Sequence, residues 1–220
     1  MKIGVLGTGT VGQTIATKLV EVGHEVTLGS RTANNEKAVA WAKATGKGAA
    51  AGTFEQVGAS SDIVFNCTLG SGALEALHMA KESNLAGKIV IDVSNPLDGS
   101  KGMPPSLFVS NTDSLGEQIQ RAFPKAKVVK TLNTMWCGLM VNPRMLPEPH
   151  VNFLAGNDAA AKTTVKGLLK SFGWRDEELF DLGDITSARG MESWLPLWLR
   201  IFGATKNGAF NLKLVSAKPA

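Results

Sequence analysis

The sequence predicts an α/β fold with a doubly wound, mostly parallel sheet and a small helical C-terminal region. Short β-branched and apolar runs alternate with helical stretches, which is typical of strands joined by crossover helices. A glycine-rich turn separates the first apolar run from the first helical stretch. The 220 residues suffice for one α/β domain and a modest appendage. We therefore expect a sheet domain over residues 1–183 and a helical region over residues 184–220.

Each predicted strand is a short apolar run that a turn or a helical stretch follows. Residues 88–93 give the cleanest buried strand, whereas the small side chains of residues 49–51 give the weakest. The predicted strands are residues 3–6, 25–28, 49–51, 62–67, 88–93, 127–132, 150–155 and 179–182. Their alternation with helices predicts the parallel sheet.

Capping residues mark several of the predicted helices. Gly23 suits the position that follows a helix, and Thr53 and Asp158 suit the position that precedes one. The predicted helices are residues 11–22, residues 35–44, a short helix after residue 53, residues 159–172, and the chain from residue 185 onward. Residues 95–113 are rich in Gly, Pro, Ser and Asn and predict a long loop, a kind of segment that is usually functional or mobile.

The glycine-rich turn has the pattern GxGxxG after a strand and before a helix. Gly7 permits a tight turn, Gly9 lets the backbone approach a pyrophosphate, and Gly12 allows the helix to pack closely on the strand. The helix N-terminus offers free N–H groups to phosphates. The motif predicts a dinucleotide-binding Rossmann fold, and the alternative is a turn that binds nothing. The predicted cofactor-binding residues here are Gly7, Thr8, Gly9, Thr10, Val11 and Gly12.

The end of the second strand distinguishes the two nicotinamide cofactors. An NAD site has Asp or Glu about 20 residues beyond the glycines, to bind the ribose 2′-hydroxyl. This chain has Ser30, Arg31 and Thr32 there, and Glu25 lies at the wrong end of the strand. A guanidinium with two hydroxyls suits a 2′-phosphate, to which Lys37 can add charge. The sequence therefore predicts NADP(H) as the cofactor.

Segments along nearly the whole chain resemble the NADPH-dependent reductases of the deazaflavin coenzyme F420. They are the glycine motif of residues 7–12, Gly23-His24-Glu25-Val26, Gly29-Ser30-Arg31, Asp92-Val93-Ser94-Asn95-Pro96, Lys130-Thr131-Leu132-Asn133-Thr134 and Phe210-Asn211-Leu212-Lys213-Leu214. The resemblance implies a dimer with NADPH along the sheet edge and a second substrate stacked on the nicotinamide. In the family, the turn after the sixth strand helps to form the deazaflavin pocket. Where well-known members have His and then Pro, this chain has Asn133 and then Trp136.

Residues that follow the later strands supply further candidates, because ligands of such sheets bind beyond the carboxyl ends of the strands. Additional cofactor-binding residues are predicted at Cys67, Thr68 and Leu69, at Ser94, Asn95 and Pro96, and at Asn133, Thr134 and Met135. The alternative for any one of them is an ordinary loop residue.

The chain offers no clear acid catalyst. It contains no tyrosine, which excludes the Tyr/Lys proton relay of short-chain dehydrogenases. A structural role is the better interpretation for His24, His78 and His150. We therefore predict no catalytic side chain and a direct hydride transfer to coenzyme F420 or a flavin, for which the protein supplies alignment. The alternatives are an NADPH-dependent reductase of a small carbonyl or imine compound or of a metal chelate, and a non-catalytic NADP(H) sensor.

Composition limits the partners. A net charge of +4 suits an anionic cofactor, but no Lys/Arg run or aromatic interleaving indicates nucleic acid. Cys67 and Cys137 have no metal-ligand spacing, so we expect no metal site and a reducing cytoplasm. Met1 and Lys2 lead directly into a strand, which argues against a signal peptide.

The C-terminal apolar stretch predicts a homodimer. Residues 194–202 place apolar side chains on every face of one helix, and a helix of that kind is normally buried. The stretch is too short to span a membrane and is interrupted by Pro196 and Arg200. A second subunit is the predicted cover, and burial against the chain's own sheet is the alternative.

Overall fold

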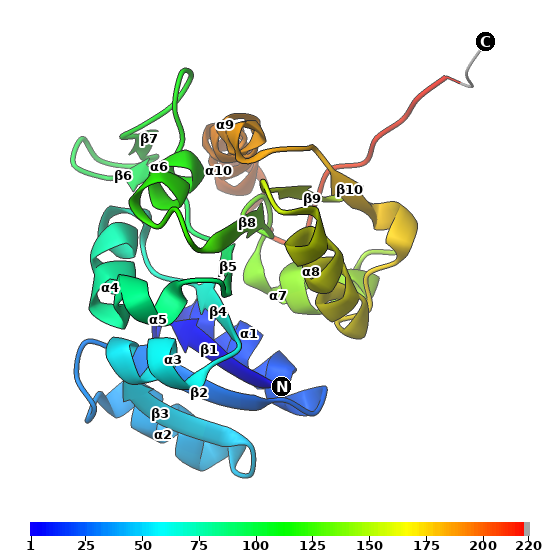
Figure 1. The fold of residues 1–220 in the computed structure, drawn as a ribbon. Helices are drawn as coiled ribbons and strands as arrows, with labels where there is room; N and C mark the ends of the chain where they lie inside the picture. The colour runs from blue at the N-terminus through cyan, green and yellow to red at the C-terminus, as the bar shows by residue number, and fades with distance from the viewer. Residues whose placement is uncertain (218–220) are drawn as a thin grey trace.

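We describe a computed structural model, which covers residues 1–217. Eight strands form one sheet: β1 (Lys2–Leu6), β2 (Glu25–Ser30), β3 (Ala49–Thr53), β4 (Ile63–Asn66), β5 (Ile89–Asp92), β8 (Lys127–Thr131), β9 (Asn152–Ala155) and β10 (Leu179–Asp181). Their order across the sheet is β10-β9-β8-β5-β4-β1-β2-β3 (Figure 1). All neighbouring pairs are parallel except β8 and β9, which are antiparallel. This arrangement confirms the predicted doubly wound, mostly parallel sheet.

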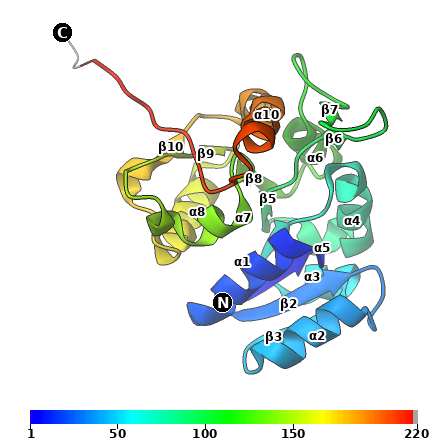
Figure 2. The same ribbon diagram turned by 180° about the vertical axis from the view of Figure 1, so that it is seen from behind.

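Helices connect the strands and cover both faces of the sheet (Figures 1 and 2). They are α1 (Thr10–Glu21), α2 (Glu36–Thr45), α3 (Phe54–Ser60), α4 (Ala73–Ala80), α5 (Glu82–Leu85), α6 (Leu115–Ala122), α7 (Cys137–Val141), α8 (Ala159–Ser171), α9 (Ala188–Ser193) and α10 (Leu195–Thr205). Short 3₁₀ turns are η1 (Gly70–Gly72), η2 (Pro143–Met145), η3 (Asp176–Glu178) and η4 (Ile185–Ser187). One buried apolar cluster includes side chains of α1, α2, α7 and α8, and the other includes side chains of α3, α4 and α6.

The predicted caps form as expected. The Thr53 hydroxyl accepts from the Gln56 amide at 3.1 Å and the Gln56 side chain accepts from the Thr53 amide, which makes a capping box for α3. Asp158 accepts from the Ala161 amide at 2.7 Å at the start of α8. Gly23 follows α1 with φ of +91°, a conformation that glycine adopts without strain.

The segment 95–113 differs from the predicted uninterrupted loop. It contains a two-stranded antiparallel hairpin of β6 (Leu97–Asp98) and β7 (Ser106–Leu107). Two residue pairs are too few to produce the alternating pattern by which a strand is recognised in a sequence.

The strand order creates an opening at the end of the sheet where the carboxyl ends of the central parallel strands lie. We call this end of the sheet the sheet edge. The chain runs outward from β1 to β2 and β3 and then returns to place β4 on the other side of β1. Connections therefore leave β1 and β4 in opposite directions, and such a switch point is where open α/β sheets bind ligands. The strand ends lie level there, since Leu6 pairs with Asn66, Asn66 with Asp92, and Asp92 with Lys130.

The chain after β10 first packs on α6 and then becomes exposed. Of the residues of α10, only Leu195 is buried, while Leu197 is 53% exposed. Trp198 stacks between Phe202 and Phe210, with ring centroids 5.5 and 5.3 Å away. The segment after α10 first packs back on the body of the molecule, where Asn211 contacts His150, and the chain then leads away from it (Figure 1). No helix within residues 1–217 combines the length and the apolar character needed to cross a membrane.

Candidate functional site

The turn between β1 and α1 has the backbone geometry that its glycines predict. Gly7 has φ of +112°, its amide donates to the Gly29 carbonyl at 3.1 Å, and an added Cβ would lie 2.7 Å from the Cys67 carbonyl oxygen. A Cβ on Gly12 would lie 1.9 Å from the Gly7 carbonyl oxygen. These two glycines are therefore needed by the fold itself, for the turn and for the close packing of α1.

Gly9 differs from the other two glycines. An added Cβ there would meet no atom within 4 Å, so the space in front of this backbone is open. Helix α1 starts directly after Gly9 with no side-chain cap and no acidic residue in its first turn. Free N–H groups and the partial positive charge of a helix N-terminus face this opening, which fits a phosphate group. Thr10 is exposed at this start, and Thr8 and Val11 are half-buried.

The end of β2 presents a cation to solvent. Ser30 is buried, and its hydroxyl is held by the backbone of Thr32. The Arg31 side chain is 60% exposed and makes a two-point contact with Glu75, with Nη2–Oε2 at 3.0 Å and Nε–Oε1 at 3.4 Å. This hydrogen bonding lowers the pKa of Glu75. Lys37 is exposed in the first turn of α2 and lines a groove between α1 and α2.

The loops that follow β1, β4, β5 and β8 touch one another in sequence along the sheet edge. Gly7 packs on Cys67, and an added Cβ on Gly70 would lie 2.0 Å from the Asn95 carbonyl oxygen. Asn95 donates to the Asn133 carbonyl at 2.9 Å and accepts from the Asn133 side chain at 2.9 Å. The structure thus brings together predicted residues from four separate strands.

The predicted residues of these loops differ in accessibility. Leu69 is 83% exposed, whereas Ser94, Asn133 and Met135 are each 5% exposed or less. Cys67 and Thr68 are half-buried, and Pro96 and Thr134 are buried. Burial, and then the nearby Asp92, raise the pKa of the Cys67 thiol, which disfavours the reactive thiolate. Among the predicted residues, the exposed ones therefore lie in the glycine turn, after β2 and after β4, whereas those after β5 and β8 are largely buried.

A buried polar network under the edge was not found by reasoning from the sequence. Asp92 Oδ1 accepts from Asn66 Nδ2 at 2.9 Å and from the Ser94 hydroxyl at 2.7 Å, and Asp92 Oδ2 pairs with Lys130 Nζ at 2.7 Å. Lys130 also pairs with Glu192 at 2.8 Å and donates to the Ser94 carbonyl. Burial opposes the charge of Lys130, but the two carboxylates outweigh it and raise the pKa of the ammonium.

Glu192 connects this network to the C-terminal region. Its carboxylate accepts from the Leu115 amide at 2.8 Å and the Gly116 amide at 3.0 Å, so it also caps α6. The polar last residues of the otherwise apolar strands β4 and β5, Asn66 and Asp92, are the signal that could have revealed the network. Glu192 has no such local signal.

The loop after β8 meets the C-terminal segment. The Trp194 indole donates to the Thr134 carbonyl at 2.9 Å. Trp136 is 40% exposed, and its ring packs on the backbone of Gly138 and Gly208, where added Cβ atoms would lie 2.3 and 3.4 Å from it. Trp136 is therefore the exposed aromatic surface on this side of the edge, whereas Met135 is buried beside Asn211.

Of the three histidines, only His150 lies near this edge, just before β9. His150 is buried, with Nε2 2.9 Å from the Pro143 carbonyl and Nδ1 2.7 Å from Asn211 Nδ2. His78 packs on Phe123. His24 precedes β2 at the opposite end of the sheet, and burial lowers its pKa. Within residues 1–217, no group of three or more His, Cys, Asp or Glu side chains is placed to hold a metal ion.

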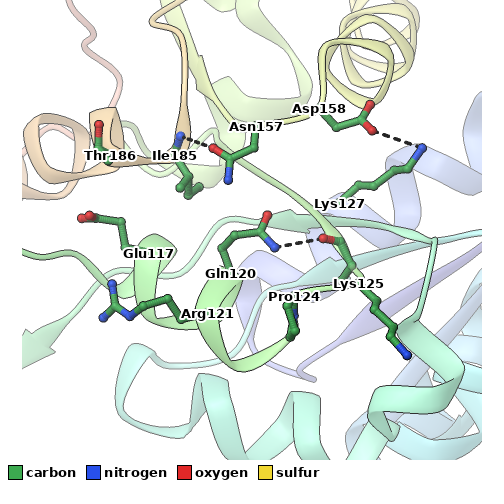
Figure 3. A pocket seen from close by; sticks show the side chains of 11 residues that line it. Glu117, Gln120, Arg121, Pro124, Lys125, Lys127, Asn157, Asp158, Ile185 and Thr186 are labelled. Carbon is green, nitrogen blue, oxygen red and sulfur yellow. Dashed lines mark hydrogen bonds and ion pairs between the residues drawn. The ribbon is translucent and has the colours of Figure 1, made fainter.

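A pocket of about 820 Å³ opens at the other end of the sheet (Figure 3). It lies between the residues that precede β8 and those that follow the antiparallel β9. Lys127 and Asp158 form an ion pair of 3.2 Å at its rim. The glycine turn follows the carboxyl end of β1, at the opposite end of the sheet from this pocket. The pocket is therefore separate from the candidate site.

Comparisons with known proteins identify relatives over most of the chain. A family model described as NADP oxidoreductase, coenzyme F420-dependent, matches residues 2–96. A crystal structure of a candidate F420-dependent NADP reductase from Arthrobacter sp. FB24 is 50% identical, with a TM-score of 0.93 over 98% of this chain and 100% of that one. The metalloreductase STEAP3 of Rattus norvegicus is 30% identical over 204 residues, which are 90% of this chain and 38% of that protein.

More distant structures share the fold. A reductive aminase from Aspergillus terreus, solved with NADPH and ethyl levulinate, is 20% identical, with a TM-score of 0.63 over 93% of this chain and 62% of that one. At this identity the likeness concerns the fold alone. The glycine turn, Arg31 and the level strand ends are thus features of a chain whose relatives include nicotinamide-dependent reductases.

Proposed function

This chain belongs to the family of coenzyme F420-dependent NADP oxidoreductases, and from that membership we propose that it transfers a hydride between NADP(H) and a deazaflavin or flavin-like acceptor. The chain is on this basis an NADP-dependent oxidoreductase. Coenzyme F420 is the proposed acceptor.

The observation that carries the proposal is the pairing of an open phosphate turn with an exposed cation. Gly9 leaves room for a pyrophosphate at the start of α1, and Arg31 stands at the end of β2, where an NAD site would have a carboxylate. A guanidinium binds a phosphate through two parallel hydrogen bonds. This combination selects NADP(H) over NAD(H).

We propose that the dinucleotide lies along the edge formed by the loops after β1, β2, β4, β5 and β8. The residues proposed to line its groove are Gly7, Thr8, Gly9, Thr10, Val11, Gly12, Ser30, Arg31, Thr32, Lys37, Cys67, Thr68, Leu69, Ser94, Asn95, Pro96, Asn133, Thr134 and Met135. NADPH supplies a hydride at its nicotinamide ring when bound. The buried network of Asp92, Lys130 and Glu192 would fix the loops after β5 and β8 that form this part of the proposed groove.

We propose that the acceptor stacks near Trp136. This indole is the exposed aromatic surface at the loop after β8, and the backbones of Gly138 and Gly208 fix its position. His150, just before β9, is buried with both ring nitrogens in contact with protein groups, so alignment and exclusion of water are the protein's proposed contributions to the transfer. We expect Trp136→Ala to reduce turnover more than it reduces NADPH binding.

Reduction of a metal chelate is the second candidate. The observation in its favour is the 30% identity to a protein named metalloreductase, although this chain spans only 38% of that protein. A carbonyl or imine substrate would need a proton donor at the edge.

We also propose a cytoplasmic homodimer in which α10 is covered by a second copy. Leu197 and Phe202 are 53% and 41% exposed on a helix with little polar surface, and such a surface is normally covered. The division into a sheet domain of residues 1–183 and a helical region from residue 184 is part of the same proposal.

Two measurements test the proposed function. Fluorescence titration is expected to show much tighter binding of NADPH than of NADH, and Arg31→Ala is expected to weaken NADPH about tenfold to a hundredfold with NADH nearly unchanged. Turnover with NADPH is then compared for coenzyme F420, flavins, ferric chelates and a cyclic imine. Fastest turnover with the ferric chelate would favour the second candidate, and tight NADPH binding without any turnover would indicate a sensor.

A further inference from the structure

The contact between Arg31 and Glu75 crosses the place where the dinucleotide is proposed to enter. Arg31 follows β2, and Glu75 lies in the first turn of α4, which follows β4. The sheet places β1 between β4 and β2. Side chains that meet from these two sides therefore span the carboxyl end of β1, where the glycine turn begins.

The contact uses the donors that a phosphate needs. Arg31 donates through Nη2 to Glu75 Oε2 at 3.0 Å and through Nε to Oε1 at 3.4 Å, so one planar side of the guanidinium is engaged. The guanidinium reaches the η1 turn, since a Cβ on Gly72 would lie 3.8 Å from Nη2. A 2′-phosphate binds Arg through the same fork of donors.

The pair is also easy to break. Both side chains are 60% exposed, and exposed ion pairs contribute little to stability. The hydrogen bonds from Arg31 lower the pKa of Glu75, so the carboxylate is charged at neutral pH. A phosphate that approaches Arg31 must therefore replace a carboxylate.

We propose that Glu75 is a specificity-determining residue, which moderates the preference for NADPH by competing with the 2′-phosphate for Arg31. This inference rests on the proposed function. NADH has no 2′-phosphate, so its binding does not require the contact to open in the same way. Glu75 thus lowers the affinity for one cofactor and leaves the other unaffected.

The test is a set of dissociation constants for NADPH and NADH in the wild type and in Glu75→Gln, Arg31→Ala and the double variant. Loss of an exposed pair corresponds to a change of about threefold to fivefold, so Glu75→Gln should bind NADPH tighter by that factor and NADH equally. In the Arg31→Ala background, Glu75→Gln should not change the dissociation constant for NADPH, because the guanidinium for which Glu75 competes is absent. Glu82→Gln, at an exposed glutamate of α5, is the matched charge control and should behave as wild type.

The outcomes separate the inference from the function on which it rests. If the wild type binds NADPH and NADH equally, the proposed NADP function fails. If NADPH is preferred but Glu75→Gln leaves its affinity unchanged or weakens it, the competition is refuted and Glu75 instead supports Arg31. Three other results would also overturn the proposal. Glu75→Gln could tighten NADH binding as well, Glu82→Gln could tighten NADPH binding equally, or the effect of Glu75→Gln could persist in the Arg31→Ala background.

Discussion

Asn95 and Asn133 bind each other reciprocally across two loops. The Asn95 side chain donates to the main-chain carbonyl of Asn133, and the Asn133 side chain donates to Asn95 Oδ1, both at 2.9 Å. Asn133 also donates to the Met191 carbonyl at 3.2 Å. Two loops whose asparagines are 38 residues apart are thereby held to one another and to the C-terminal region.

Asn95→Ala is expected to lower the free energy of unfolding by about 1–3 kcal/mol, because it removes both bonds and takes the Asn95 donor away from the buried main-chain carbonyl of Asn133. Urea unfolding measures this change. Asn34→Ala, at an exposed loop position, is the control and should have little effect. Equal midpoints for the two variants would show that the reciprocal bonds do not stabilise the edge.

Gly9→Val is expected to abolish binding of NADPH and NADH without a loss of thermal stability. The added side chain enters open space in the protein but fills the position proposed for the pyrophosphate. Gly12→Val should instead destabilise the fold, since its Cβ would lie 1.9 Å from the Gly7 carbonyl oxygen. Retained NADPH binding in a folded Gly9→Val protein would place the phosphate turn elsewhere.

Lys130→Met is expected to destabilise the protein by about 3–5 kcal/mol, because Asp92 and Glu192 would be buried without their cation. Urea unfolding measures this change, from the midpoint and the slope of the transition. Lys125→Met removes an exposed lysine from the same region of the chain and should change the midpoint little. A small effect at residue 130 would mean that the carboxylates are neutralised in another way.

Leu197→Lys is expected to convert the proposed dimer into a monomer, because it places a charge on the exposed apolar face of α10. Light scattering after size-exclusion chromatography reports the mass. Val39→Lys alters an apolar residue that is 46% exposed on α2 and should leave the mass unchanged. A wild-type mass equal to that of one chain would contradict the dimer directly.

The pair of Asp113 and Arg121 is expected to make the free energy of unfolding depend on pH under acidic conditions. Hydrogen bonds from Arg121, at 3.0 and 2.8 Å, lower the pKa of Asp113 from 3.8 to about 2. A carboxyl whose pKa is lowered by folding stabilises the protein above its ordinary pKa and loses that contribution as the pH falls towards the folded value. Asp113→Asn should therefore cost roughly 1 kcal/mol or less near neutral pH and progressively less as the pH falls below about 4. Urea unfolding of both proteins across this range would show the two curves converge, and parallel curves would exclude the pair as the cause.

Local patterns predicted the strands, the glycine turn and several helix caps, but not helices α4 and α5. The turn of residues 7–12 and the caps Thr53 and Asp158 depend on neighbouring residues, so a sequence reveals them directly. The sequence Ser114-Leu115-Gly116-Glu117 also has the capping pattern of a helix start, and Ser114 does cap α6, so this helix could have been placed.

Features that depend on residues far apart in the chain could not be predicted from the sequence. Glu192 caps a helix that begins 77 positions earlier in the chain, and nothing near it in the sequence indicates this. The Arg31–Glu75 contact depends on the strand order, which brings together residues 44 positions apart. The placement of Arg31 at the sheet edge was predictable, but the residue that contacts it was not.

The reversed direction of β9 brings the C-terminal segment to the same end of the sheet as the loop after β8. Because β9 runs against β8, residues just before it lie at the same edge as Asn133, and there the Val151 amide donates to the Leu212 carbonyl at 2.9 Å. The segment around Leu212 is thereby held beside the proposed acceptor surface at Trp136, while the phosphate turn and Arg31 come from the other half of the sheet. Exchange of the segment after Ser193 between relatives would therefore change the chain that packs beside Trp136 and leave the phosphate turn and Arg31 in place.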